Sequence, residues 1–69
     1  MDSHQIEIGE LLKEARDKKK LTQAQVATGA GVNVNYYARI ERGEENPTIE
    51  ILRKLAKALN VKSSEILPF

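Results

Sequence analysis

The chain has no cysteine, so neither disulfide bonds nor thiolate ligands for a metal are available to stabilise it. Its one histidine, His4, lies in a polar N-terminal stretch and has no second ligand at a suitable spacing. No apolar run approaches the roughly 18 residues of a membrane span, and the N-terminus lacks the hydrophobic segment of a signal peptide. These absences predict a cytoplasmic protein with no metal, no cofactor and no membrane partner.

A large excess of positive charge is also absent. The net charge of the 69 residues is +1, although 30% of them are charged and 41% are hydrophobic. This length and composition predict one small globular domain. The basic residues gather in three clusters, which either face a partner or simply form solvated helix surfaces: Lys18–Lys20; Arg39 and Arg42; and Arg53, Lys54 and Lys57.

The first part of the chain has the pattern of an amphipathic helix. We expect residues 1–5 to form a flexible tail and residues 6–69 to form the domain. From Ile6 to about Lys19 the apolar residues recur at the spacing of one helix face: Ile8, Leu11, Leu12 and Ala15.

A second helix is predicted from its start and stop signals. Thr22 and Gln25 have the spacing of a capping box, which opens a helix at about Gln23. Gly31 can adopt the left-handed backbone that ends a helix in a tight turn.

Two more helices follow by the same reasoning. Asn33 is a suitable N-cap for a third helix that runs to about Arg42 and ends at Gly43. Thr48, preceded by a proline, is a suitable N-cap for a fourth helix that runs to about Leu59.

The C-terminal residues predict a last short helical turn, which we count as the fifth helix. Ser63 or Ser64 would cap it, Glu65–Leu67 would form it, and Pro68 would end it. No segment has the alternating pattern of a strand, so the sequence predicts an all-α fold of five helices.

The third predicted helix has two distinct faces. On a helical wheel, Tyr37 and Ile40 point one way, and the opposite side presents Asn35, Ala38, Arg39 and Arg42. In a DNA major groove, arginine can bind guanine, asparagine can bind adenine, and small apolar side chains can contact the thymine methyl group. The alternative is an ordinary amphipathic surface helix.

The spacing of the second and third helices favours DNA binding. Two short helices joined by a turn with a glycine have the form of a helix-turn-helix, in which the second helix contacts bases. Gln23 would stand at the N-terminus of the first of the two, where its amide and the free backbone N–H groups can hold a phosphate. The alternative for Gln23 is a residue that makes only local hydrogen bonds.

Residues 8–67 resemble the helix-turn-helix domain of the Cro/phage-repressor (XRE) family of transcriptional regulators. The matching elements are Arg16, "LTQAQVA", Gly31, "IERG", "NPT" and "AKALNV". The resemblance implies a lambda-repressor-like fold that binds double-stranded DNA.

The resemblance also assigns roles to residues of this chain. The positions that face bases in the family are occupied here by Val34, Asn35, Ala38 and Arg39. The positions that contact the DNA backbone are occupied by Gln23, Tyr36 and Arg42. A pair that is ionic in many members is occupied by Arg16 and Glu41, which would join the first helix to the third.

Two features depart from the family pattern. Tyr37 stands where an aliphatic residue is usual, so the core must accommodate a hydroxyl group. Glu44 and Glu45 stand in a loop that often carries a basic residue near the phosphates. Acidic side chains there repel DNA unless they point away from it, so we expect a homodimer to be needed for tight binding.

The fourth helix offers a surface for such a dimer. Its apolar arc is wider than a monomer core requires, and the surplus either forms a self-complementary patch or is covered by the chain's own C-terminus. The residues concerned are Ile49, Ala56, Ala58, Ile66, Leu67 and Phe69.

The sequence therefore predicts a sequence-specific transcriptional regulator, of repressor or controller type, that binds an inverted-repeat operator as a homodimer. The alternative is a protein-interaction module of the same fold, antitoxin-like or coactivator-like, that binds a protein partner and has only a secondary affinity for DNA. An enzyme is not expected, because the chain has no cysteine, no usable histidine and no carboxylate cluster suited to catalysis.

Overall fold

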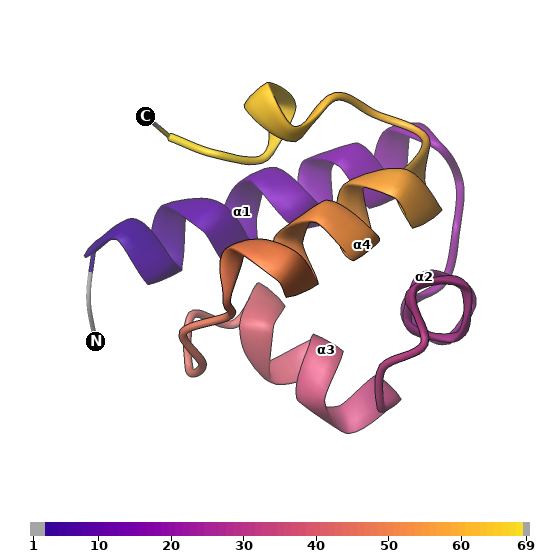
Figure 1. Ribbon diagram of the computed structural model, residues 1–69, viewed down its shortest axis with the longest axis horizontal. Helices are drawn as coiled ribbons and strands as arrows, with labels where there is room; N and C mark the ends of the chain where they lie inside the picture. The colour runs from indigo at the N-terminus through magenta and orange to yellow at the C-terminus, as the bar shows by residue number, and fades with distance from the viewer. Residues whose placement is uncertain (1–2, 69) are drawn as a thin grey trace.

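The computed structural model describes residues 3–68 and consists of helices joined by short turns (Figure 1). Their order is α1 (Ser3–Lys18), α2 (Gln23–Ala30), α3 (Val34–Glu41), α4 (Ile49–Leu59) and the 3-10 turn η1 (Ser63–Glu65). The described residues contain no strand, so the all-α prediction is confirmed.

The predicted count of five helices is not confirmed, although a short turn does form where the fifth was expected. This turn, η1, is a single 3-10 turn of three residues that begins at Ser63 rather than at Glu65. The Glu65 carboxylate accepts a hydrogen bond from the backbone N–H of Lys62 at 2.9 Å, which closes the turn. At Ile66 the backbone leaves the helical region, with a φ of −118°, and the side chain enters the core with no exposed surface. The helical turn thus ends at the residue whose side chain enters the core.

The first helix begins earlier than predicted. Residues 3–5 belong to α1, so the flexible tail predicted for residues 1–5 is wrong for these three, and residues 1–2 lie outside the described residues. These residues are polar, so no apolar periodicity indicates that the helix begins there. The structure shows what stabilises the first turns, because the backbone and side chain of Ile6 lie directly against Gly43 in the loop after α3.

The predicted N-caps of the other helices are confirmed. Thr22 and Gln25 form both hydrogen bonds of a capping box. The side chain of Asn33 accepts hydrogen bonds from two backbone N–H groups of α3, and the Thr48 hydroxyl accepts one from α4. Each helix therefore begins at a residue that satisfies its otherwise unpaired N–H groups.

The four helices also end in one common way. A residue with left-handed backbone follows each of them, and the N–H groups of this residue and the next donate back to carbonyls of the last turn. Gly31 and Gly43 were predicted for this role. The other two residues, Lys20 and Asn60, have side chains, so their left-handed conformation carries a steric cost.

The core lies where α1, α2, α3 and α4 meet. Helix α1 packs on α3, α2 packs on both α3 and α4, and the C-terminal segment lies along α1 and α4 (Figure 1). The largest fully buried side chains come from every one of these elements: Leu12, Val26, Tyr37, Ile40, Leu55, Leu59 and Ile66.

The predicted apolar surplus of α4 is mostly covered within the chain. Ile66 has no exposed surface and Ala56 is 3% exposed, while Ala58 lies 3.3 Å from the position that a Cβ on Gly29 would take. Ile49 is 52% exposed, and Phe69 lies outside the described residues. Of the two alternatives, cover by the chain itself therefore holds for the buried members, because the C-terminal segment and α2 pack against the same arc.

Helices α1 and α3 cross at a glycine. A Cβ on Gly9 would stand 2.6 Å from the carbonyl oxygen of Ile40, closer than van der Waals contact allows. Only a residue without a side chain lets the two backbones approach this closely.

In the described part of the chain, no helix is long and apolar enough to cross a membrane.

Candidate nucleic-acid interface

The turn between α2 and α3 consists of Gly31, Val32 and Asn33. Gly31 has a φ of 72°, in the left-handed region, and it redirects the chain immediately after α2. In Figure 1 α2 is seen end-on while α3 runs across the view, so the two helix axes are far from parallel. This is the arrangement of a helix-turn-helix, with α3 as its second helix.

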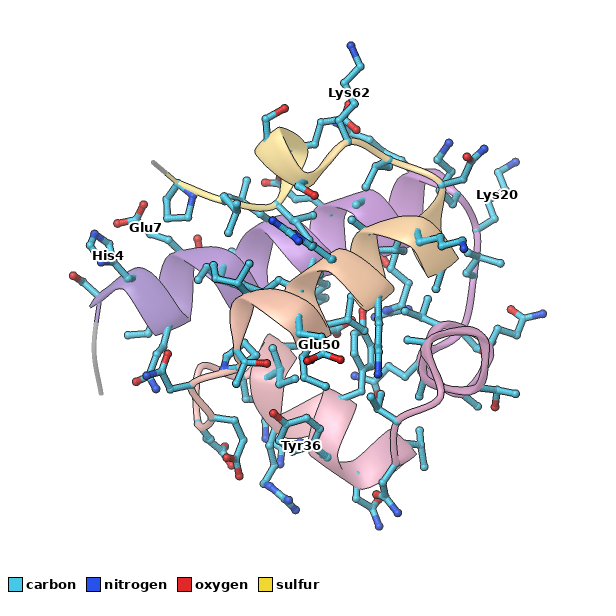
Figure 2. The ribbon with its side chains drawn as sticks, in the orientation of Figure 1. His4, Glu7, Lys20, Tyr36, Glu50 and Lys62 are labelled. Carbon is cyan, nitrogen blue, oxygen red and sulfur yellow. The ribbon has the colours of Figure 1, made fainter. Side chains whose placement is uncertain are left out.

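Two buried side chains fix the rotation of α3 about its own axis. Tyr37 and Ile40 are both 0% exposed and belong to the core cluster. Because side chains recur at about 100° per residue, burial of this pair turns the opposite side of α3 to solvent. Figure 2 shows Tyr36 on α3, at the side of the molecule opposite to Lys62.

The structure brings the four predicted base-facing residues to this outer side of α3. Val34 is 40% exposed, Asn35 is exposed, Ala38 is half-buried, and the side chain of Arg39 is 43% exposed. Of the residues predicted to contact the DNA backbone, Arg42 is exposed just after α3, and Tyr36 is half-buried against the core cluster.

Below this surface, a single carboxylate joins three helices. The Nε of Arg16 donates to Oε2 of Glu41 at 2.7 Å, and a terminal nitrogen of the same guanidinium donates to Oε1 at 3.2 Å. Arg16 also donates to the backbone oxygen of Leu21 at 3.0 Å, which ties α1 to the start of the helix-turn-helix. This is the bidentate bridge that the sequence suggested between α1 and α3.

The second hydrogen-bond partner of Glu41 is Gln23. Its amide nitrogen donates to Oε1 of Glu41 at 3.0 Å, so the bond is neither to DNA nor local. Sequence reasoning considered only a phosphate or a helix-start partner for this amide. The heptapeptide "LTQAQVA" gives no sign that α2 and the end of α3 share a hydrogen bond.

The Arg16–Glu41 pair is charged in the folded protein. Burial alone would raise the pKa of Glu41, but hydrogen bonding, above all from Arg16, more than offsets it and holds the pKa below its usual value. Hydrogen bonding to Glu41 raises the pKa of Arg16 in turn. Only 4% of the Glu41 side chain is exposed, so this carboxylate depends on its donors.

Tyr37 brings its hydroxyl group into the same region. Burial raises the pKa of Tyr37, and the hydroxyl has no hydrogen-bond partner among the described residues. No described neighbour makes a hydrogen bond of ordinary geometry with this hydroxyl, but it lies close enough to the Glu41 carboxylate to lower the pKa of Glu41, and the carboxylate adds to the rise in the pKa of Tyr37.

The two arginines of the outer face are both paired with glutamates. The Nε of Arg39 donates to Oε2 of Glu45 at 2.9 Å. Arg42 donates to Glu44 twice, from Nε at 2.8 Å and from a terminal nitrogen at 3.3 Å. The hydrogen bonds lower the pKa of Glu44 and raise that of Arg42. Sequence reasoning noted the two acids after "IERG" but missed that they bind the arginines before them.

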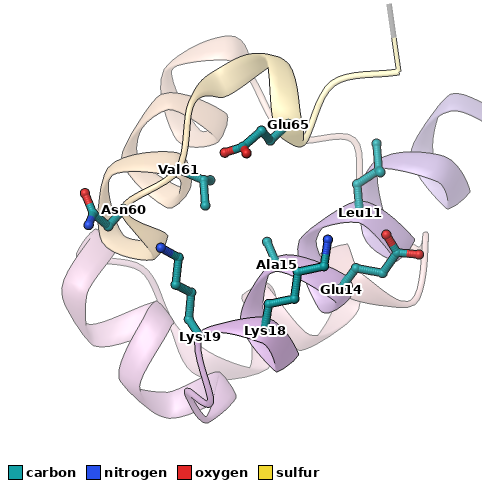
Figure 3. Close-up of a pocket in the computed structure, with 8 residues that line it drawn as sticks. All are labelled: Leu11, Glu14, Ala15, Lys18, Lys19, Asn60, Val61 and Glu65. Atoms are coloured by element: carbon teal, nitrogen blue, oxygen red, sulfur yellow. The ribbon is translucent and has the colours of Figure 1, made fainter.

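A hollow lies elsewhere on the molecule (Figure 3). It has a volume of about 430 Å³ and is formed by α1 and the segment after α4, with no residue from α2 or α3. Its lining mixes charges of both signs: Leu11, Glu14, Ala15, Lys18, Lys19, Asn60, Val61 and Glu65. It is separate from the outer face of α3.

Comparison with known proteins identifies the family. A family model described as helix-turn-helix matches residues 12–66. The immunity repressor protein of Bacillus phage phi105 is 38% identical over 60 residues, which are 87% of this chain and 42% of the repressor. Multiprotein-bridging factor 1 of Candida albicans is 37% identical over 57 residues, which are 83% of this chain and 38% of that protein. The chain therefore spans less than half the length of either relative.

A solved structure matches over the whole fold. The restriction-modification controller protein C.AhdI from Aeromonas hydrophila has a TM-score of 0.92 and is 30% identical, over 96% of this chain and 100% of that chain. Sequence, fold and the geometry of α2 and α3 thus agree. The chain belongs to the helix-turn-helix family of the Cro/phage-repressor (XRE) type that its motifs indicated.

Proposed function

We propose that this domain is a sequence-specific double-stranded DNA-binding regulator of transcription, of repressor or controller type, that inserts α3 into the major groove. The observation that carries the proposal is the orientation of α3. Tyr37 and Ile40 anchor its inner side in the core, and Asn35 and Arg39 project from its outer side. The likeness to a phage repressor and to a restriction-modification controller supports the same function.

Within this proposal, the outer residues of α3 divide by chemistry. Arg39 has the donors for guanine, Asn35 has the donor and acceptor for adenine, and Val34 and Ala38 provide apolar contact for a thymine methyl group. Gln23, Tyr36 and Arg42 would contact phosphates, which positions the domain without reading sequence. For Gln23 the contact would come from the backbone N–H groups at the start of α2, because the side-chain amide already donates to Glu41.

We further propose that the domain binds as a homodimer. One copy carries one α3, and its longest dimension is 26 Å. Adjacent major-groove half-sites lie about 34 Å apart on one side of the duplex, so a second copy is needed to fill the second half-site. Two copies related by a two-fold axis would recognise an inverted repeat.

Random-site selection on the purified protein tests this function. We expect an enriched inverted repeat with half-sites about one helical turn apart, and an affinity for random DNA that falls steeply with salt. Sedimentation with and without the selected duplex would show whether two copies bind. Absence of any enriched sequence would refute the regulator proposal.

The alternative, a protein-interaction module, is favoured by one observation. Both arginines of the outer face are already paired with glutamates, which lowers the positive potential of that surface. The likeness to a multiprotein-bridging factor points the same way. Such a module would show no enriched sequence and almost no salt-dependent binding to random duplex DNA.

A further inference from the structure

The loop after α3 turns back toward the helix that precedes it. Gly43, with a φ of 77°, reverses the chain, and the N–H groups of Gly43 and Glu44 donate to carbonyls of the last turn of α3. This reversal brings Glu45 to Arg39, six residues earlier, and Glu44 to Arg42. Two glutamates of the loop therefore meet the two arginines of the outer face.

The two ion pairs use the guanidinium groups differently. Glu44 accepts hydrogen bonds from the Nε and one terminal nitrogen of Arg42. Glu45 accepts a hydrogen bond only from the Nε of Arg39. Within residues 3–68, the terminal nitrogens of Arg39 have no hydrogen bond. Those terminal nitrogens are the donors that make a bidentate contact with O6 and N7 of guanine. Arg39 can thus bind Glu45 and a guanine at the same time.

We propose that Glu45 is a positioning residue that sets the base preference of this domain by holding Arg39 with its terminal nitrogens directed at a base edge. The inference rests on the proposed DNA-binding function. An arginine oriented before binding loses less side-chain freedom when it meets the correct base. If Arg39 instead turns to a phosphate, it leaves the Glu45 carboxylate unpaired beside the negatively charged backbone. Glu45 therefore favours base contact by Arg39 over phosphate contact.

The neighbouring glutamate provides a matched control. Glu44→Ala and Glu45→Ala remove the same charge from adjacent positions of one loop, so their general effect on attraction to DNA is the same. Both pairs are partly exposed, with 34% of the Glu45 side chain and 42% of the Glu44 side chain accessible. Neither substitution should change the thermal unfolding midpoint appreciably, because exposed ion pairs contribute little stability.

Random-site selection and competition binding on the intact chain test the proposal. Glu45→Ala should reduce the preference at one base pair about five- to tenfold, at the base pair where Arg39→Ala also removes preference. Glu44→Ala should strengthen binding to selected and random duplexes by the same factor and leave the base profile unchanged. In an Arg39→Ala background, Glu45→Ala should have no further effect on base preference.

Failure of the Glu45 inference and failure of the proposed DNA-binding function give different results. If the wild-type protein enriches a sequence but Glu45→Ala gives the same base profile as Glu44→Ala, Glu45 does not position Arg39, and the DNA-binding function stands. A change in base preference on Glu45→Ala that persists without Arg39 would also overturn the inference. If the wild-type protein enriches no sequence, the proposed function fails and the inference fails with it.

Discussion

Arg16 on α1 and Glu41 at the end of α3 are joined by two hydrogen bonds, the shorter of which is 2.7 Å. Gln23 at the start of α2 donates to the same carboxylate at 3.0 Å. One acidic group thus fixes the relative positions of α1, α2 and α3. The outer face of α3 is presented at an angle that depends on this carboxylate.

Removal of Arg16 should destabilise the fold strongly. Arg16→Ala would leave the carboxylate of Glu41, 4% exposed, without its cationic partner, at a cost of about 3 kcal/mol. Chemical denaturation of wild type and variant measures the difference. Asp17→Ala is the control, because the Asp17 side chain is 61% exposed and lies 3.7 Å from the same guanidinium. Equal effects of the two substitutions would contradict a dominant role for Glu41.

Acid should weaken the fold through the same group. The pKa of Glu41 lies below its usual 4.5 in the folded protein. The unfolded chain therefore takes up this proton first, and the stability that Glu41 contributes is present above about pH 4.5 and is lost as the pH falls through the lowered pKa. Between about pH 5 and pH 3, the unfolding free energy of Glu41→Gln should decline less than that of wild type. Parallel declines in the two proteins would assign the acid sensitivity to other carboxylates.

The buried phenol of Tyr37 should be replaceable by phenylalanine. Tyr37→Phe removes a hydroxyl that has no hydrogen-bond partner among the described residues, so the unfolding free energy should change by less than about 0.5 kcal/mol or rise by about 1 kcal/mol. Tyr36→Phe, at the preceding residue, which is half-buried, is the comparison. A loss of more than about 1 kcal/mol in Tyr37→Phe alone would show that the hydroxyl is satisfied in solution.

A glycine should stabilise the end of α1. Lys20 has a φ of 57° in the residue position that glycine most often takes after a helix, and a side chain there is sterically unfavourable. Lys20→Gly should raise the unfolding free energy by about 0.5–1 kcal/mol. Asn60→Gly should gain less, because asparagine tolerates the left-handed region better than lysine does. A larger gain at Asn60 would contradict this account.

Loss of Arg39 should affect sequence preference, while loss of Arg42 should not. Arg39→Ala should cost about 1–3 kcal/mol on the selected duplex and relax the preference at one base pair, expected to be G·C. Arg42→Ala should weaken binding to selected and random duplexes alike, because phosphate contacts carry no sequence information. Titrations of both duplexes at one salt concentration make the comparison. An unchanged selected motif in Arg39→Ala would show that α3 does not contact that base.

The helices could be predicted because their signals are local. Thr22 with Gln25, Asn33 and Thr48 act on N–H groups within three residues of themselves, so their spacing along the chain is sufficient. The short turn at the C-terminus could not be predicted in the same way. Its length depends on Ile66, whose burial requires a core that only the assembled helices create.

The side-chain contacts on the outer face of α3 and directly below it could not be predicted from local sequence signals. Arg16 and Glu41 were paired through a family resemblance, whereas the third partner, Gln23, is 18 residues from Glu41 and has no such signal. The pairs of Arg39 with Glu45 and of Arg42 with Glu44 depend on the reversal of the chain at Gly43. Sequence predicted that reversal as a helix end, but not where the next two side chains would point.

The residues that stabilise α3 differ from those whose side chains project from its outer face. Asn33 caps its start, the Gly43 turn closes its end, and Tyr37 and Ile40 hold it in the core. The outward residues contribute only backbone groups to the cap and the turn, and none of their side chains belongs to the core cluster: Val34, Asn35, Ala38 and Arg39. The side chains that hold α3 in the fold are thus different from those on its outer face, so simultaneous substitution of these four positions should leave the scaffold folded, whatever it does to a bound partner.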